Sequence, residues 1–188
     1  VPTWSALGFG FTELGAATWH AQPGNPEPRL FRAVADEAII NPMGFNNIGA
    51  EAIATQLMEW RALGRWPDHP VGINLGKSKI TPLEKAAEDY AQSFRVLRPH
   101  LDFFVVNVSS PNTPNLRQLQ DKSALNEILS AIQEIQSPTS ADQKSKIKSG
   151  KCGSHQKSKP VLVKVAPDLS FEALDEILEL VGPRQIAG

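Results

Sequence analysis

DFFVVNVSSPNTPNLR, residues 102–117, is the stretch from which the fold is interpreted. It begins with an aromatic and β-branched run and then becomes polar, with two serines, three asparagines and an arginine. Such a continuous apolar run predicts a strand buried on both faces. In parallel α/β proteins, functional groups stand just beyond the carboxyl ends of such strands. The polar residues therefore lie where a site is expected, although Ser, Asn and Pro also form ordinary turns.

The composition is that of an ordinary soluble globular chain, with 188 residues of which 41% are hydrophobic and 21% are charged. The formal net charge of −1 gives no basic footprint for nucleic acid. The single cysteine, Cys152, excludes an intrachain disulfide framework. No apolar stretch approaches the roughly 18 residues of a membrane span. The chain starts at Val1 rather than Met and ends in what resembles the beginning of a strand, so we expect a fragment of a longer protein.

Predicted strands and helices alternate along the chain. Apolar runs predict strands at residues 7–14, 38–40, 70–75 and 160–166, and helical spacing predicts helices at 48–63, 81–97, 123–136 and from 170 onward. A capping box, Thr81-Pro82-Leu83-Glu84, is predicted to open the second helix. This alternation predicts a parallel α/β fold. A (β/α)8 barrel typically needs about 250 residues, so this chain would supply about half of one.

Residues 137–159 differ from the rest of the chain. They are rich in Ser, Lys, Gln and Gly and contain almost no large apolar residues. This composition predicts a solvated, low-complexity insertion. Cys152 lies inside it, so we do not expect this thiol to be a catalytic nucleophile.

Three asparagines, Asn41, Asn74 and Asn107, follow or end predicted strands, and Lys164 lies in a fourth. Each has an ordinary explanation, since Asn forms turns and a strand lysine can extend along the surface. Together with the serine hydroxyls after Asn107, they predict one binding site at the carboxyl ends of the strands, lined with amides, hydroxyls and a cation. Amides suit a flat heterocycle with alternating N–H and C=O groups, and a fixed cation suits a cofactor that becomes negative on reduction. The histidines lack metal-ligand spacing and there is no G-x-S-x-G motif, so metal and hydrolase sites are disfavoured.

Six blocks of sequence occur in a fixed order: LGFGFTELG (7–15), GNPEPRLFR (24–32), INPMGFNN (40–47), GINLGKSK (72–79), NVSSPNTPNLR (107–117) and VLVKVAPDL (161–169). Together they resemble the dihydroorotate dehydrogenase family over nearly the whole chain apart from the insertion. The resemblance implies a TIM barrel, of which the chain would hold roughly strands 2–5 and the start of strand 6. It also implies a single FMN-binding domain over residues 1–188 that oxidises dihydroorotate to orotate in pyrimidine synthesis.

The resemblance favours the quinone-dependent class, because the loop contains Ser109 and Ser110 where the soluble class has a cysteine. It implies that Ser110 is the catalytic base and that Ser109 is its structural neighbour. The substrate-binding residues implied are Asn41, Pro42, Met43, Gly44, Phe45, Asn107 and Asn112. The FMN-binding residues implied are Ala16, Asn74, Asn107 and Lys164, and no metal is implied. Arg32 matches an arginine on the side from which quinone enters.

The chain departs from the family pattern at Ala16, where Ser or Thr is usual, at Pro42 and at Asn115, where Gly is usual. Asn tolerates a positive φ, so we expect the turn at Asn115 to be kept. The family's first strand, its later strands with their phosphate-binding loops, and its membrane-associating helices would lie outside Val1–Gly188. We therefore expect peripheral membrane association of the full-length protein, at a bacterial or mitochondrial inner membrane.

Two competing hypotheses remain from the sequence. One is a soluble-class enzyme that uses fumarate or a nicotinamide cofactor, against which Ser110 argues. The other is that the 188-residue chain alone is an inactive fragment without bound flavin, because a barrel that lacks strands exposes edges and apolar faces.

Overall fold

The structure is a computed structural model that describes residues 2–137 and 158–188. Its centre is a four-stranded sheet in the order β1–β4–β5–β6, with every neighbouring pair parallel. The strands are β1 (Thr12–Ala17), β4 (Val71–Leu75), β5 (Phe103–Asn107) and β6 (Val161–Lys164). The expected parallel α/β architecture is therefore confirmed.

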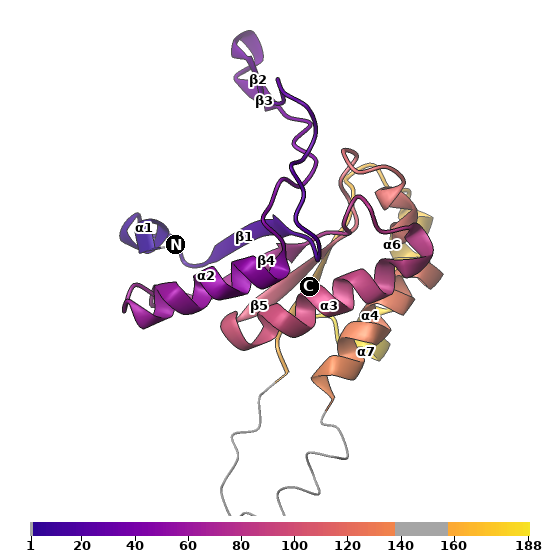
Figure 1. The fold of residues 1–188 in the computed structure, drawn as a ribbon. Coiled ribbons are helices and arrows are strands. Elements are labelled where there is room, and N and C mark those ends of the chain that lie inside the picture. Colours follow the sequence, from indigo (N-terminus) through magenta and orange to yellow (C-terminus); the bar gives the residue numbers. More distant parts are fainter. Residues whose placement is uncertain (1, 138–157) are drawn as a thin grey trace, which may run out of the picture.

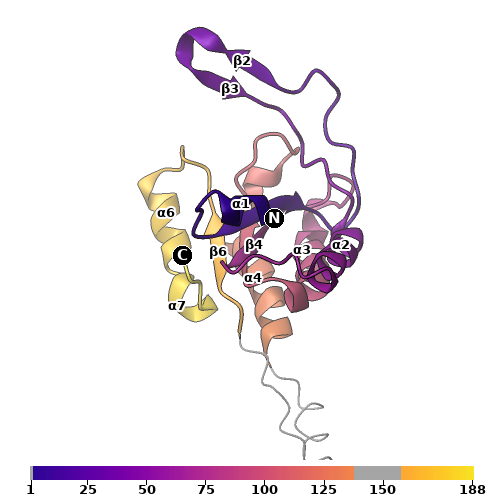
Figure 2. The same cartoon turned by 90° about the vertical axis from the view of Figure 1, so that its left-hand side faces the viewer.

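Helices follow the strands and cover one face of the sheet (Figures 1 and 2). They are α2 (Ala50–Ala62), α3 (Ala86–Leu97), α4 (Lys122–Gln136), α6 (Phe171–Leu178) and the short α7 (Val181–Arg184). Short elements complete the described chain: α1 (Pro2–Ala6), η1 (Val34–Asp36), η2 (Leu83–Lys85), η3 (Arg98–His100) and η4 (Leu116–Gln120). No helix within the described residues is long and apolar enough to cross a bilayer.

The core lies between the helices and the face of the sheet that carries Ile73, Phe104 and Val106, all fully buried. On this face the ring of Phe94 from α3 packs on that of Phe104, with centroids 4.5 Å apart. Strand side chains alternate between the two faces, so the residues next to Ile73, Phe104 and Val106 in sequence point to the face away from the helices. The opposite face carries the predicted site residues, because the register pairs Gly15 with Asn74 and Asn107 with Lys164.

The first strand lies later than predicted. The apolar run at residues 7–14 predicted a strand there, but β1 begins at Thr12. Gly8 has φ +84°, which is incompatible with an extended strand, and residues 2–6 form the unpredicted helix α1. Gly15, predicted to end the strand, instead lies within it at a register shift next to Ala17.

The run at residues 38–40 is a strand, but it does not belong to the parallel sheet. It is β3 (Ala38–Ile40), which pairs antiparallel with β2 (Phe31–Ala33) in a separate hairpin that projects beyond the sheet (Figure 1). Ile39 and Ile40 are each 62% exposed, so their apolar side chains do not contribute to the core. The prediction that Asn41 follows a strand of the parallel sheet was therefore wrong.

The helix boundaries confirm some predicted signals and contradict another. Ser170 caps α6 by accepting a hydrogen bond from the Ala173 amide, and Asn115 has φ 59° at the start of η4. The capping box at Thr81 does not form. Its hydroxyl donates instead to the carboxylate of Asp89, and a 3-10 turn precedes α3.

The predicted insertion at residues 137–159 falls largely outside the described residues, as does Cys152. At the other side of β6, the Ala187 amide donates to the carbonyl of Val161, and the Val163 amide donates to that of Gly188. These two hydrogen bonds place residues 187–188 beside β6, but no strand is assigned in the described residues after α7, so the strand start expected at the end of the sequence is not confirmed.

Candidate active site

Two amide side chains and a carboxylate form a hydrogen-bonded row across β1, β4 and β5, called here the amide row. The Asn107 amide on β5 donates to Oδ1 of Asn74 on β4 at 2.9 Å. The Asn74 amide in turn donates to Oε1 of Glu13 on β1 at 2.8 Å. Asn74 and Asn107 are both buried. The two predicted strand-end amides are therefore brought together and oriented by each other.

Asn107 also fixes the loop that follows it. Its Oδ1 accepts hydrogen bonds from the Ser109 amide at 3.0 Å and from the Ser109 hydroxyl at 2.8 Å. Ser110 is less buried, and its Oγ accepts a longer bond from the backbone N–H of Asn112 at 3.3 Å. The two serines thus differ: the Ser109 hydroxyl is engaged with the amide row, whereas within the described residues no acceptor takes the proton of the Ser110 hydroxyl.

The turn at residues 41–45 meets this loop, although it comes from the hairpin rather than from the sheet. Nδ2 of Asn112 donates to the carbonyl of Asn41 at 3.1 Å. Asn25 joins both segments, because its Nδ2 donates to the carbonyls of Pro42 at 3.0 Å and Asn112 at 3.2 Å. The predicted substrate turn and the loop that carries Ser110 therefore lie side by side.

Two further contacts place the turn over the end of β4. Gln22 donates to the carbonyl of Gly44 at 2.9 Å, and Gly44 and Phe45 have φ values of 71° and 57°. The Phe45 ring lies against Gly76, where an added Cβ would be 2.5 Å from the ring. Gly76 is therefore needed for this close approach.

Lys164 and Ala16 lie at the same end of the sheet. Lys164 is exposed, and within the described parts of the chain no group forms a hydrogen bond or ion pair with its ammonium. Ala16 is half-buried and follows Gly15, at which an added Cβ would lie 2.7 Å from the Asn74 carbonyl. Arg32 is not part of this cluster, since it is exposed on β2 in the projecting hairpin (Figure 2).

A buried polar cluster supports the segment after β4 and the helix behind Asn107. Asp89 accepts hydrogen bonds from the Ser78 amide and the Thr81 hydroxyl, and Lys77 donates to the carbonyls of the same two residues. Burial lowers the pKa of Lys77, an effect opposed by Asp89. Burial, aided by Asp89, raises the pKa of Tyr90, so its hydroxyl stays protonated and remains a donor.

Tyr90 donates to the carbonyl of Asn107 at 2.8 Å, within the buried core. Tyr90→Phe should lower the free energy of unfolding by about 1–3 kcal/mol, because the buried carbonyl loses its partner while the ring is kept. Urea denaturation measures this difference, and an unchanged slope with urea concentration would show that the native and unfolded states remain comparable. A midpoint equal to that of the parent protein would contradict the assigned bond.

Several contacts that organise this site come from residues that the sequence did not single out. These are Gln22, Asn25 and Tyr90. Tyr90 was predicted only as part of an apolar helix stripe, and the others stand in segments where polar residues are common. Within residues 2–137 and 158–188, no three His, Cys, Asp or Glu side chains gather in a way that could hold a metal ion.

The chain matches one protein family over its whole length. A family model described as dihydroorotate dehydrogenase matches residues 1–188. Curated proteins named dihydroorotate dehydrogenase (quinone) are 52% identical over 185 residues in Trichormus variabilis, 53% over 187 in Thermosynechococcus vestitus and 52% over 188 in Gloeobacter violaceus. These matches cover 98%, 98% and 100% of this chain but 43%, 44% and 46% of the relatives. The chain therefore spans less than half the length of these relatives.

Solved structures of DHODH from Eimeria tenella have the same fold over this chain. The complex with ferulenol aligns with a TM-score of 0.79 and 33% identity, and covers 97% of this chain and 50% of that one. The ligand-free form aligns with a TM-score of 0.80 and 33% identity, and covers 96% of this chain and 51% of that one.

Proposed function

This chain belongs to the dihydroorotate dehydrogenase family, and from that premise we propose that the full-length protein oxidises dihydroorotate to orotate in pyrimidine synthesis. FMN is the proposed hydride acceptor and a quinone the final electron acceptor. The observation that carries the proposal is the joining of the Ser110 loop to the turn at residues 41–45 beside the amide row. This contact supports the proposal because it brings the proposed proton acceptor next to the amides proposed to bind a small heterocycle.

The chemistry of the donors at this site fits FMN. Asn74 and Asn107 carry amides, which both donate and accept and so match the alternating N–H and C=O groups of a flavin edge. Lys164 carries an ammonium that no described residue pairs with, and it stands at the strand position beside Asn107. When bound, FMN supplies a two-electron acceptor for the hydride that leaves the substrate. Ala16 contributes only its backbone and methyl group to the proposed cofactor site.

The proposed role of Ser110 is to accept a proton from the ring CH2 carbon of dihydroorotate while the neighbouring carbon loses a hydride. The two losses create the double bond of orotate, so atoms and electrons balance. A serine hydroxyl is a weak base, so it must pass its own proton onward, and a site closed to bulk water favours this relay. Thr113, buried in the same loop, is the proposed relay partner together with water.

The proposed substrate contacts are made by amides and by the turn that the loop touches. They are Asn107 and Asn112, together with Asn41, Pro42, Met43, Gly44 and Phe45. The side chain of Asn112 contacts the turn, and its backbone N–H donates to the Ser110 hydroxyl. Substrate binding and placement of the base are thus linked through one residue.

Quinone is proposed to approach from the side of the hairpin that carries Arg32. The hairpin and its tip expose apolar side chains at Phe31, Val34, Ile39 and Ile40, which suits an apolar electron acceptor. The full-length protein is proposed to be a peripheral protein of a bacterial or mitochondrial inner membrane. Nucleic acid is not among the proposed partners, since the net charge is −1.

The proposed reaction is tested by purifying the full-length protein and measuring its flavin content and its activity with dihydroorotate. We expect bound FMN and turnover with a quinone analogue, with little or none when fumarate or NAD is the only acceptor. Turnover with fumarate or NAD in place of quinone would assign the protein to the soluble class. Failure of dihydroorotate to reduce bound flavin would overturn the proposal.

Lys164→Met should lower the reduction potential of the bound flavin. The ammonium favours the reduced, negatively charged cofactor, and losing it should shift the potential by roughly 30–60 mV to more negative values, equal to about 10–100-fold in relative affinity for the two redox states. Equilibration with reference dyes measures the shift. Lys159→Met, which removes the same charge just before β6, is the matched control and should leave the potential unchanged. Equal shifts in both variants would contradict a local role for Lys164.

A further inference from the structure

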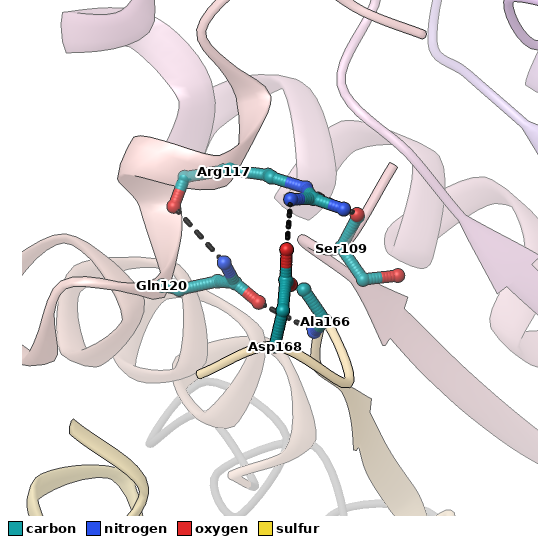
Figure 3. Close-up of polar contacts among 5 residues, drawn as sticks. All are labelled: Ser109, Arg117, Gln120, Ala166 and Asp168. Carbon is teal, nitrogen blue, oxygen red and sulfur yellow. Dashed lines mark hydrogen bonds and ion pairs between the residues drawn. The ribbon is translucent and has the colours of Figure 1, made fainter. Parts of the chain in front are cut away.

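Two side chains of the 3-10 helix η4 (Leu116–Gln120) join the loop after β5 to the loop after β6 (Figure 3). Arg117 makes the first link. Its Nε donates to the carbonyl of Ser109 at 3.2 Å, and its Nη1 pairs with Oδ2 of Asp168 at 2.9 Å. Figure 3 shows its guanidinium between these two partners.

Gln120 makes a second, buried link. Its Nε2 donates to the carbonyl of Arg117 at 3.3 Å, and its Oε1 accepts from the Ala166 amide at 2.6 Å. Gln120 is 8% and Ala166 is 3% exposed. A buried amide without a partner is costly, so Gln120 determines where the chain can lie after β6.

These links act on the segments that carry Ser110, the proposed base, and Lys164, the proposed FMN contact. The Ser109 carbonyl belongs to the same planar peptide as the Ser110 nitrogen, so Arg117 restricts the orientation of the Ser110 backbone. Ala166 follows Lys164 by two residues, where the strand ladder has ended. Asn107 and Lys164 are paired neighbours on β5 and β6. Beyond this pair, the side chains of η4 connect the two segments that follow these strands.

The Arg117–Asp168 pair contributes little to stability, because the two side chains are 40% and 64% exposed and water screens the charges. What it restricts is geometry, since a planar guanidinium can serve both partners in few orientations. Gln120, the last residue of η4, fixes the same helix to the buried Ala166 backbone. Geometry, rather than net stabilisation, is therefore the effect that these contacts have in common.

We propose that Gln120 and Arg117 are positioning residues, which hold the Ser110 loop and the segment after Lys164 at a fixed separation for proton and hydride removal. This inference rests on the proposed dehydrogenase function. Removal of a proton and a hydride from neighbouring carbons of one ring requires the base and the cofactor site to be aligned at the same time, and small displacements slow such steps strongly.

Gln120→Met in the full-length protein is the main test, because methionine keeps the length of the side chain but neither donates to Arg117 nor accepts from Ala166. Flavin reduction by dihydroorotate should slow by roughly 10–100-fold, the cost of a displacement of about 1 Å. The dissociation constant of orotate and the rate of reoxidation by quinone should change less than about twofold, because neither needs the base to be aligned. Gln118→Met, on the exposed side of the same helix, is the matched control and should retain parent kinetics.

Amide hydrogen exchange provides a readout that does not depend on activity. Gln120→Met should speed exchange in peptides that cover 161–169, with no change in those covering α3. Gln120→Glu keeps an acceptor for the Ala166 amide, so it should restore protection there and recover part of the reduction rate. Should Gln120→Met fold poorly, Asp168→Leu removes only the exposed link and should slow reduction by roughly two- to fivefold without shifting the unfolding midpoint.

Faster exchange in Gln120→Met with unchanged flavin reduction would overturn the positioning role, and so would equal losses in reduction, orotate binding and reoxidation. Parent-like reduction in Asp168→Leu would exclude the Arg117–Asp168 pair from that role. A parent protein that dihydroorotate cannot reduce would instead overturn the proposed function, and the exchange data would still show whether the link exists.

Discussion

Ser110→Ala in the full-length protein should slow the reduction of flavin by dihydroorotate by roughly 10²–10⁴-fold, the usual contribution of a positioned general base. The expectation follows from the difference between the two serines of the loop. The Ser109 hydroxyl donates to Asn107, whereas among the described residues the Ser110 hydroxyl only accepts a long bond from the backbone N–H of Asn112. Anaerobic stopped-flow absorbance of the flavin measures the reduction rate directly.

The same variant provides its own control, because reoxidation by quinone does not require a base next to dihydroorotate. That rate should be unchanged, and orotate should bind with nearly the parent affinity. Ser109→Ala is a useful comparison, since it should disturb Asn107 and therefore binding as well as rate. Unchanged reduction kinetics in Ser110→Ala would remove Ser110 from the role of base.

Asn107→Leu should lower the free energy of unfolding by about 2–4 kcal/mol, since each orphaned buried polar group costs about 1–3 kcal/mol. Leucine has a similar volume but leaves the Ser109 amide without its acceptor and Oδ1 of Asn74 without its donor. The protein should also be purified with little flavin, because the amide row would be broken at its centre. Urea denaturation and flavin absorbance per mole of protein measure the two effects.

Asn126→Leu is the matched control for that change. Asn126 is half-buried on α4, away from the strand ends, and accepts one hydrogen bond from Arg184. The Asn126→Leu variant should lose less unfolding free energy than Asn107→Leu and should keep its flavin. The unfolding free energy and flavin content of Asn107→Asp should lie between those of Asn107→Leu and Asn126→Leu. A carboxylate still accepts from Ser109 but cannot donate to Asn74. Equal stability and flavin content in Asn107→Leu and Asn126→Leu would contradict a central role for Asn107.

The sheet was predictable because its strands are continuous apolar runs that a parallel α/β fold buries. The runs at 70–75, 102–107 and 160–166 contain β4, β5 and β6. The errors have physical causes. Two glycines separated apolar residues from the strand that follows them, so β1 was placed too early. Ile39 and Ile40 looked like core residues, but nothing in their local sequence distinguishes an exposed hairpin from a short buried strand.

The candidate site was predictable only where its residues stand at strand ends. Asn74, Asn107 and Lys164 could be grouped because parallel strands share one carboxyl end. The contacts of Asn25 with Asn112 and of Gln120 with Ala166 join segments far apart in the chain. Polar side chains of this kind have no local signal, since the same residues serve equally well in solvent-exposed turns and helices.

The strand order has a consequence for how the chain assembles. The residues that pair between β4 and β5, such as Gly72 and Phe103, are closer in sequence than the pairs between β1 and β4 or between β5 and β6. Closing a shorter loop costs less chain entropy, although each doubling of loop length adds only about 0.6 kcal/mol. The connecting segment also contains α3, whose Phe94 packs on Phe104. The unit β4–α3–β5 therefore requires the least prior ordering for the contacts it forms, and we expect it to form first when this sheet folds.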